Sequence, residues 1–173
     1  MTTIAYDGRM LAADMQHTFG GSSKYQRPRS KIKRIRYGDR RFIAALSGTE
    51  PGAMALIEWY VHSTNSGGRR VIDYPLDSPI LPEDRSATVL IAELFKTGPH
   101  KVVHVSSNGA VYEANGQYAI GSGADFAEGA MAAGAAAYVA VEIASKFDVF
   151  SGMGVEVVDL KDHPLDAYLF TVL

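Results

Sequence analysis

Residues 1–14 read MTTIAYDGRMLAAD, and this stretch decides how the amino-terminal part of the chain folds. It holds two strand-like runs, Thr2–Tyr6 and Arg9–Asp14, joined by Asp7-Gly8. Because Asp-Gly readily adopts the positive φ angles of a tight type I′ turn, the stretch predicts a β-hairpin. Its first strand begins with two threonines directly behind the start methionine, so the question is whether either threonine has a chemical role.

The segments that follow predict a loop, a second hairpin and a helix. Residues 17–30 are polar and rich in glycine and serine, which indicates a loop. Residues 31–48 predict a hairpin that turns at Gly38-Asp39. Thr49 can cap a helix whose apolar residues recur at helical spacing to about His62. Residues 64–85 carry three prolines, which disfavour a regular helix there.

Strands return from Ala87 and are followed by helices. Residues 87–121 hold four strand-like runs separated by turn residues such as Asn108-Gly109 and Asn115-Gly116, which predicts an antiparallel meander. The alanine-rich residues 124–147 predict two helices divided near Gly134. Two final strands are expected, at residues 154–160 and 167–173, on either side of a turn at Asp162-His163-Pro164.

This grouping of strands and helices favours an α+β fold over alternating β-α-β units. About ten strands are too many for one flat sheet over a small core, so two stacked antiparallel sheets covered by helices are expected. The length of 173 residues is most simply one domain spanning the whole chain.

Composition excludes several classes of protein. The content of 47% hydrophobic and 21% charged residues is that of a globular protein. The absence of cysteine excludes disulfide scaffolds, thiolate zinc sites and a cysteine nucleophile. No apolar run is long enough to span a bilayer and no signal peptide is evident, so we expect a cytoplasmic protein without membrane partners.

A basic segment runs from Lys24 to Arg41 and holds nine of the 17 lysines and arginines, with Asp39 as its one acid. Such a stripe could contact phosphates. The net charge of −2 and the lack of any nucleic-acid motif favour instead a solvated strand edge that resists aggregation. Nucleic acid is therefore not expected as a partner.

Several common catalytic and cofactor motifs are missing. Ser122 has glycine on both immediate sides, whereas a nucleophile elbow needs G-x-S-x-G. No phosphate-binding glycine loop is present, so no cofactor is expected. His100 and His104 would lie roughly 13 Å apart on one strand, too far to share a metal ion. We therefore expect no metal site.

An amino-terminal threonine needs particular partners to act as a nucleophile. If Met1 is removed, the free α-amine of Thr2 can accept the proton of its own hydroxyl, since its pKa of about 7.7–8 is close to working pH. A lysine would favour the neutral amine, a carboxylate would fix that lysine, and a backbone N–H would bind the oxyanion. The hairpins permit Asp14, Lys31 and Gly48 in these places.

Six motifs occur in the order seen in β-type proteasome subunits and the bacterial HslV peptidase, which are N-terminal nucleophile hydrolases. The matching stretches are TTI, AADMQ, KIKRI, IAALSG, YAIGSG followed by a helix, and EIASKFDVFSGMGVEVVDL. The chain therefore resembles this family over nearly its whole length. The resemblance implies a four-layer αββα sandwich of two antiparallel sheets flanked by helices, and threonine peptidase activity on unfolded polypeptides. It also implies a homo-oligomeric ring and an ATP-dependent unfoldase as partner.

The resemblance also implies the roles of individual residues. The catalytic set would comprise Thr2, Asp14, Lys31, Gly48, Ser122, Asp148 and Ser151, with the last three in supporting roles. Thr3 would be a rival nucleophile only if processing removed one more residue. Leu46 matches a position on the floor of the specificity pocket, so cleavage after hydrophobic residues is expected, with Thr18 and Ser47 also contacting substrate.

Two departures from the family keep an alternative open. Residues 67–85 replace the usual second helix with a proline-bearing segment, and Phe147 stands where proteasome subunits usually have arginine. A retained Met1 would block the α-amine. The alternative is a catalytically silent homologue that serves as an assembly or scaffold subunit.

Overall fold

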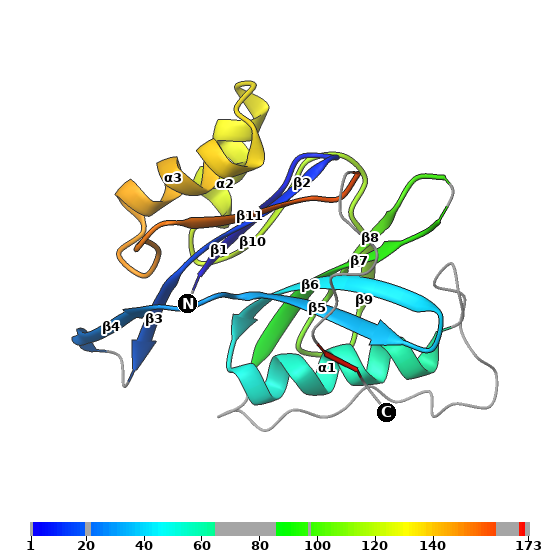
Figure 1. Ribbon diagram of the computed structural model, residues 1–173. Helices are drawn as coiled ribbons and strands as arrows, with labels where there is room; N and C mark the ends of the chain where they lie inside the picture. Colours follow the sequence, from blue (N-terminus) through cyan, green and yellow to red (C-terminus); the bar gives the residue numbers. More distant parts are fainter. Residues whose placement is uncertain (1, 20–21, 65–85, 97, 162–169, 172–173) are drawn as a thin grey trace. The chain divides into compact units, whose positions relative to one another are not determined.

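The computed structural model describes residues 2–19, 22–64, 86–96, 98–161 and 170–171, except for the side chains of residues 19–27 and 170–171 (Figure 1). These residues fall into two compact units. The first comprises the described parts of residues 1–32 and 115–163, and the second those of residues 33–114 and 164–173. The expectation of one domain for the whole chain stays a prediction.

The first unit contains a four-stranded antiparallel sheet in the order β10-β1-β2-β11. Its strands are β1 (Thr3–Tyr6), β2 (Met10–Asp14), β10 (Tyr118–Gly121) and β11 (Val155–Asp159). The predicted amino-terminal hairpin is confirmed, because β1 and β2 pair around a Gly8 whose φ is 95°. The strand expected at residues 154–160 is confirmed as β11.

Two helices cover one face of this sheet (Figure 1). They are α2 (Ala124–Ala132) and α3 (Ala137–Phe147), and the predicted division near Gly134 is confirmed by a φ of 98° at that residue. The contact between helices and sheet is built mainly from alanines, including Ala127, Ala140 and Ala144, all fully buried. Such small side chains let the helix backbones approach the strands closely.

Residues 16–28 correct one expectation. They were predicted to lie in a loop from residue 17, but β3 (Gln16–Phe19) and β4 (Ser22–Pro28) pair as an antiparallel hairpin. The sequence missed this hairpin because its strands lack alternating apolar residues, whereas the hydrogen bonds between strand backbones need none.

The second unit contains a six-stranded sheet in the order β12-β5-β6-β7-β8-β9. The strands are β5 (Ile32–Tyr37), β6 (Arg40–Gly48), β7 (Ala87–Leu94), β8 (Lys101–Val105), β9 (Val111–Glu113) and β12 (Phe170–Thr171). The pairs β6–β7, β7–β8 and β8–β9 are antiparallel, whereas β12 is parallel to β5. Helix α1 (Glu50–Ser63) packs on this sheet, and its predicted cap is confirmed by the Thr49 hydroxyl, which accepts a hydrogen bond from Gly52 N.

The predicted four-strand meander is only partly correct. Strands β7, β8 and β9 pair in succession, but β10 leaves this sheet and pairs with β1 in the first unit. The chain turns at Asn115-Gly116, where Gly116 has a φ of 83°. An Asn-Gly dipeptide specifies a sharp turn but not the sheet that receives the next strand. The expectations for residues 65–85, 162–169 and 172–173 lie outside the described residues.

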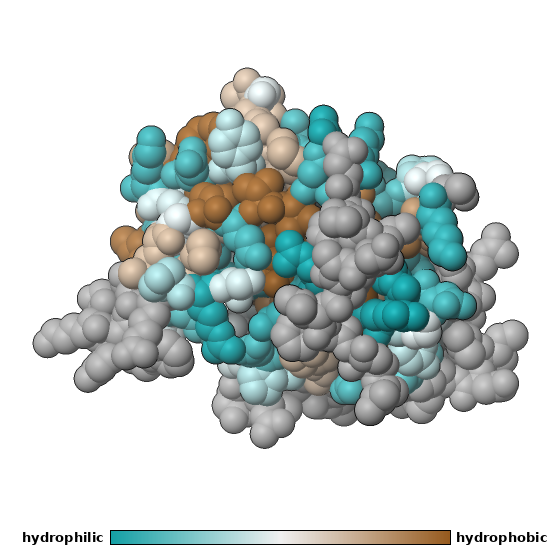
Figure 2. Space-filling view, in the orientation of Figure 1, coloured by the Kyte–Doolittle hydropathy of each residue, from teal (hydrophilic) through white to brown (hydrophobic). Residues whose placement is uncertain are grey.

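Several large apolar side chains of the first unit are exposed, and brown surface is visible over α3 and β11 in Figure 2. They are Phe126, Tyr138, Phe147, Val149, Met153 and Val157. Phe126 and Phe147 stack on each other with ring centroids 5.4 Å apart. No helix among the residues with assigned structure is long and apolar enough to cross a membrane.

A buried ion pair fixes the end of α1 against the sheet of the second unit. Arg40 Nε lies 2.7 Å from Oε1 of Glu93, whose side chain is only 2% exposed. The same guanidinium donates to the carbonyl oxygens of Val61 and Thr64, at 3.0 and 2.6 Å. Arg40 therefore neutralises a buried carboxylate and satisfies carbonyl groups at the carboxyl end of a helix.

We expect Arg40→Met to lower the free energy of unfolding by about 3–5 kcal/mol, because it leaves the Glu93 charge buried without a partner. Urea denaturation would measure this change. The double variant Arg40→Met with Glu93→Leu should recover part of the loss, since no buried charge remains. Arg36→Met is the matched control, because Arg36 is exposed and its Nε donates to Gly38 O; it should change stability by less than about 0.5 kcal/mol. Equal stability of Arg40→Met and Arg36→Met would contradict this prediction.

Candidate active site

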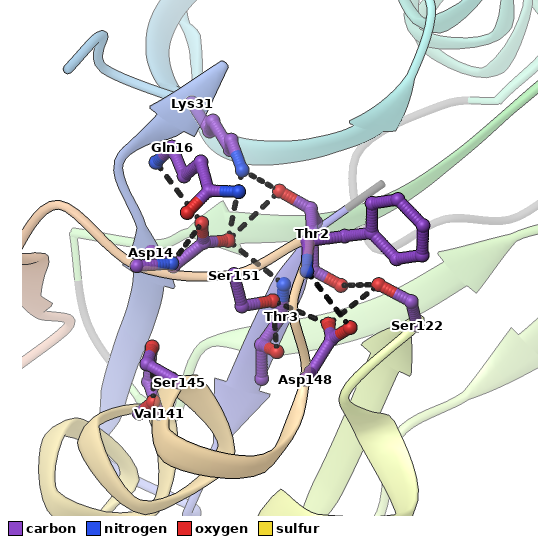
Figure 3. A network of polar contacts seen from close by, with 12 residues as sticks. Thr2, Thr3, Asp14, Gln16, Lys31, Ser122, Val141, Ser145, Asp148 and Ser151 are labelled. Carbon is purple, nitrogen blue, oxygen red and sulfur yellow. Dashed lines mark hydrogen bonds and ion pairs between the residues drawn. The ribbon is translucent and has the colours of Figure 1, made fainter. Parts of the chain in front are cut away.

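Asp14 ends β2 with no solvent exposure. Its Oδ1 accepts hydrogen bonds from Thr2 Oγ1 at 2.9 Å, from Thr3 N at 2.8 Å and from Lys31 Nζ at 2.8 Å (Figure 3). Its Oδ2 accepts from the backbone N–H groups of Gln16 at 3.0 Å and Gly152 at 3.1 Å. The surrounding donors compensate for the removal of this carboxylate from water, and the carboxylate fixes the position of each donor.

The Thr2 hydroxyl lies between Asp14 and Lys31 (Figure 3). It donates to Asp14 Oδ1, and it accepts a hydrogen bond from Lys31 Nζ. Lys31 directly precedes β5 and is itself only 5% exposed. Burial lowers the pKa of the Lys31 amine below its ordinary value, although the Asp14 carboxylate favours the charged form. An amine with a lowered pKa therefore donates a hydrogen bond directly to the Thr2 hydroxyl.

A second carboxylate, that of Asp148, follows α3. Its Oδ2 accepts hydrogen bonds from the hydroxyls of Ser122 and Ser151, each at 2.6 Å, and its Oδ1 accepts from Phe150 N at 3.1 Å. Burial alone would raise the pKa of Asp148, but these hydrogen bonds hold that pKa below its ordinary value. Ser122 Oγ also lies 3.4 Å from the carbonyl oxygen of Thr2, so this group contacts the Thr2 main chain.

The two glycines beside Ser122 have steric reasons to be glycine. Gly121 has a φ of 98°, and a Cβ built on it would overlap the carbonyl oxygen of Thr2. A Cβ on Gly123 would overlap the hydroxyl of Thr3. The G-S-G sequence therefore lets β10 and the start of α2 approach the amino-terminal strand closely. This close packing explains why glycine stands on both immediate sides of Ser122.

Gln16 and Gly152 take part in the site without having been assigned a role from sequence. Gln16 Nε2 donates to Val149 O at 3.0 Å, which ties the end of β2 to the loop after α3. A Cβ on Gly152 would lie 2.8 Å from Gln16 Oε1, so a side chain there would displace the end of the Gln16 side chain. Gln16 is part of the AADMQ stretch that matches the family, two residues after Asp14, and this position could have indicated its role.

The structure brings together six of the predicted residues in the first unit: Thr2, Asp14, Lys31, Ser122, Asp148 and Ser151. Their catalytic roles stay predictions. Gly48, Leu46 and Ser47 are on β6 in the second unit, and their roles also stay predictions. Thr18 is on β3, and its buried Oγ1 has no hydrogen-bond partner among the residues that the structure describes. Within those residues no cluster of three or more histidine, aspartate or glutamate side chains could hold a metal ion.

No protein-family profile and no curated protein sequence matches the chain. Many solved structures do. BPH from Thiobacillus denitrificans is 27% identical with a TM-score of 0.56, and the match covers 94% of this chain and 99% of that one. A second structure of that BPH contains epoxomicin, with 25% identity, a TM-score of 0.57, and coverage of 94% and 99%.

Two further solved structures are similar over most of their length. Eukaryotic HslV from Trypanosoma brucei is 21% identical with a TM-score of 0.57, and the match covers 91% of this chain and 97% of that one. A helical assembly of the Anbu complex from Pseudomonas aeruginosa is 11% identical with a TM-score of 0.62, and coverage is 98% and 84%. The α+β fold expected from the sequence is thereby confirmed: two larger sheets, each with one or more helices, make a fold consistent with that of proteasome-like N-terminal nucleophile hydrolases.

We expect Gly121→Ala to lower the free energy of unfolding by roughly 3 kcal/mol or more, because strain at positive φ is joined by overlap with the Thr2 carbonyl. Gly8→Ala is the matched control: its φ of 95° is nearly the same, but no atom lies within 4 Å of the added Cβ. It should cost only about 1–2 kcal/mol. Chemical denaturation of both variants measures the difference, and equal losses would contradict a packing role for Gly121.

Proposed function

We propose that this chain, which has the fold of the N-terminal nucleophile hydrolases, is a threonine-type endopeptidase whose nucleophile is Thr2 after removal of Met1. The observation that supports this most directly is the Thr2 hydroxyl held between the Asp14 carboxylate and the Lys31 amine. A threonine hydroxyl alone is a poor nucleophile. A threonine hydroxyl becomes an activated nucleophile when a free α-amine on the same residue and a lysine with a lowered pKa are both next to it.

In the proposed reaction the α-amine of Thr2 accepts the hydroxyl proton while Oγ1 attacks the carbonyl carbon of the scissile peptide bond. The buried Lys31, fixed by Asp14, stabilises negative charge that develops on Oγ1 and favours the neutral form of the α-amine. We assign the oxyanion to the backbone N–H of Gly48 as a prediction. The tetrahedral intermediate collapses when the leaving amine takes the proton, which leaves an ester on Thr2. A water molecule, deprotonated by the same α-amine, then hydrolyses that ester.

Asp148, Ser122 and Ser151 would hold the main chain around Thr2 in place. The hydroxyls of both serines donate to Oδ2 of Asp148, and Ser122 Oγ also lies 3.4 Å from the Thr2 carbonyl oxygen. This local arrangement shows how Asp148 is supported although Phe147 stands where the family usually has arginine. Asp148 obtains its donors from two serines and a backbone N–H, so it does not depend on an arginine at position 147. This observation favours activity over the alternative of a silent assembly subunit.

We propose that the enzyme works as an oligomer of identical subunits. The solved helical assembly of an Anbu complex supports self-association within this fold, and exposed apolar side chains such as Phe126 and Phe147 offer surface for it. A ring, an ATP-dependent unfoldase that delivers unfolded polypeptide, and a cytoplasmic location stay predictions from the sequence.

The nucleophile can be tested with epoxomicin, the compound in the second BPH structure. Intact mass should show loss of Met1 and one epoxomicin adduct per chain. Thr2→Ala should give neither an adduct nor peptide hydrolysis. Lys31→Ala should lower kcat/KM by about 10²–10⁴-fold, the usual contribution of a proton-handling group.

Lys33→Ala is the matched control for Lys31→Ala, since Lys33 is two residues away but pairs with Glu50 in the second unit. It should keep wild-type activity. A protein that retains Met1 and hydrolyses no peptide would be the silent homologue. Hydrolysis that persists in Thr2→Ala would assign the activity to another residue.

The specificity can be tested with a panel of fluorogenic peptides that differ in the residue before the cleaved bond. We expect preference for medium-sized hydrophobic residues, because the apolar Leu46 is predicted to form the floor of the pocket. Leu46→Ala should shift the preference toward larger hydrophobic residues. A clear preference of the wild-type protein for acidic or basic residues would contradict this role of Leu46.

A further inference from the structure

Thr3, the second of the two amino-terminal threonines, is not used by the proposed reaction, yet both of its polar groups reach the site. It has no solvent exposure. Its backbone N–H donates to Asp14 Oδ1 at 2.8 Å, and its hydroxyl lies 2.7 Å from the Ser151 hydroxyl. Thr3 is therefore in contact with both carboxylate groups of the site, with Asp14 directly and with Asp148 through Ser151.

The direction of the hydrogen bond between Thr3 and Ser151 follows from the proton count. Ser151 has one hydroxyl proton and donates it to Asp148 Oδ2 at 2.6 Å. The Ser151 oxygen must then accept from Thr3, so the Thr3 hydroxyl is the donor. This chain of hydrogen bonds, called the relay below, runs from Thr3 through Ser151 to Asp148, and it orients the Ser151 hydroxyl toward the carboxylate.

The protein makes room for this hydroxyl. A Cβ on Gly123 would overlap Thr3 Oγ1 and would lie 3.2 Å from Asp148 Oδ2. The φ of Gly123 is −94°, which any residue can adopt, so backbone conformation does not require glycine there. The space that glycine leaves is the space that the Thr3 hydroxyl occupies.

We infer that Thr3 is a positioning residue: its hydroxyl ties the Asp148 group to the start of β1, which Thr2 directly precedes, and so fixes the reactive residue relative to Lys31. The inference rests on the proposed function, because it gives Thr3 a role only if Thr2 is the nucleophile. Thr3 touches neither substrate nor reacting atoms. It acts through the backbone that joins it to Thr2 and through Ser151.

The test compares Thr3→Val with Thr3→Ser. Valine keeps the shape of threonine and loses the hydroxyl, whereas serine keeps the hydroxyl; both leave the backbone bond to Asp14 unchanged. Peptide turnover should be measured with active sites counted by the epoxomicin adduct. We expect kcat of Thr3→Val to fall roughly 10- to 100-fold, the scale of a misplacement of about 1 Å, with KM nearly unchanged. Thr3→Ser should restore most of the wild-type kcat.

Two further variants separate positioning from general stability. Ser151→Ala interrupts the same relay, so combining it with Thr3→Val should lower kcat little beyond the larger single effect. Thr64→Val removes a hydroxyl that donates to Tyr60 O at 2.6 Å at the end of α1, and it should leave kcat unchanged. If Thr3→Val fails to fold, the inference requires Ser151→Ala, with Thr3 intact, to show the same loss of kcat at unchanged KM.

The outcomes distinguish this inference from the function on which it rests. A wild-type protein that forms no epoxomicin adduct and cleaves no peptide would overturn both. An active wild-type protein whose Thr3→Val variant keeps full kcat, or whose Thr3→Ser variant is as impaired as Thr3→Val, would overturn the inference alone. Fully additive losses in Thr3→Val with Ser151→Ala would also overturn it, because the two residues would then act separately.

Discussion

The carboxylate of Asp14 is the interaction on which the site depends. It is removed from water at the end of β2, and an ion so placed is stable only if donors surround it. Those donors come from separate parts of the chain: the amino terminus, the residue after the strand, the lysine that precedes β5, and the loop beyond α3. The need to satisfy one charge therefore brings together the groups that surround Thr2.

The loop after α3 and the turn after β10 have small residues that allow close packing around the site. Gly121, Gly123 and Gly152 each leave room for a group of the site that a side chain would displace. Their neighbours Ser122 and Ser151 contribute hydroxyls to Asp148. Small residues allow close approach and polar residues supply donors, so residues 121–123 and 151–152 serve the same purpose around Asp148.

The sequence predicted the features that depend on local chemistry. The turn at Asp7-Gly8, the division at Gly134 and the cap at Thr49 each follow from what one or two residues can do with their backbone or side chain. The pairing of β10 with β1 could not be predicted this way, because it depends on which sheet edge is free elsewhere in the chain. The polar β3–β4 hairpin was missed because apolar residues do not alternate along its strands.

The same distinction holds for the site. Asp14, Lys31 and Ser122 could be proposed from residue type together with the resemblance to a family. The contributions of Gln16 and Gly152 are largely made by backbone N–H groups, which every residue except proline has, so residue type alone cannot indicate them. The hydroxyl of Thr3 could be read as a rival nucleophile, and only its contact with Ser151 indicates a different role.

The pairing of β1 with β10 has a consequence for the order of events during synthesis. Tyr6 pairs with Tyr118, so over a hundred residues must be added before the first strand can find this partner. At roughly 5–20 residues per second that interval is on the order of ten seconds, and β11, which completes the sheet, emerges later still. Pairings so distant along the chain form slowly. A nascent chain therefore lacks the complete arrangement around Thr2 until residues 155–159 have been made.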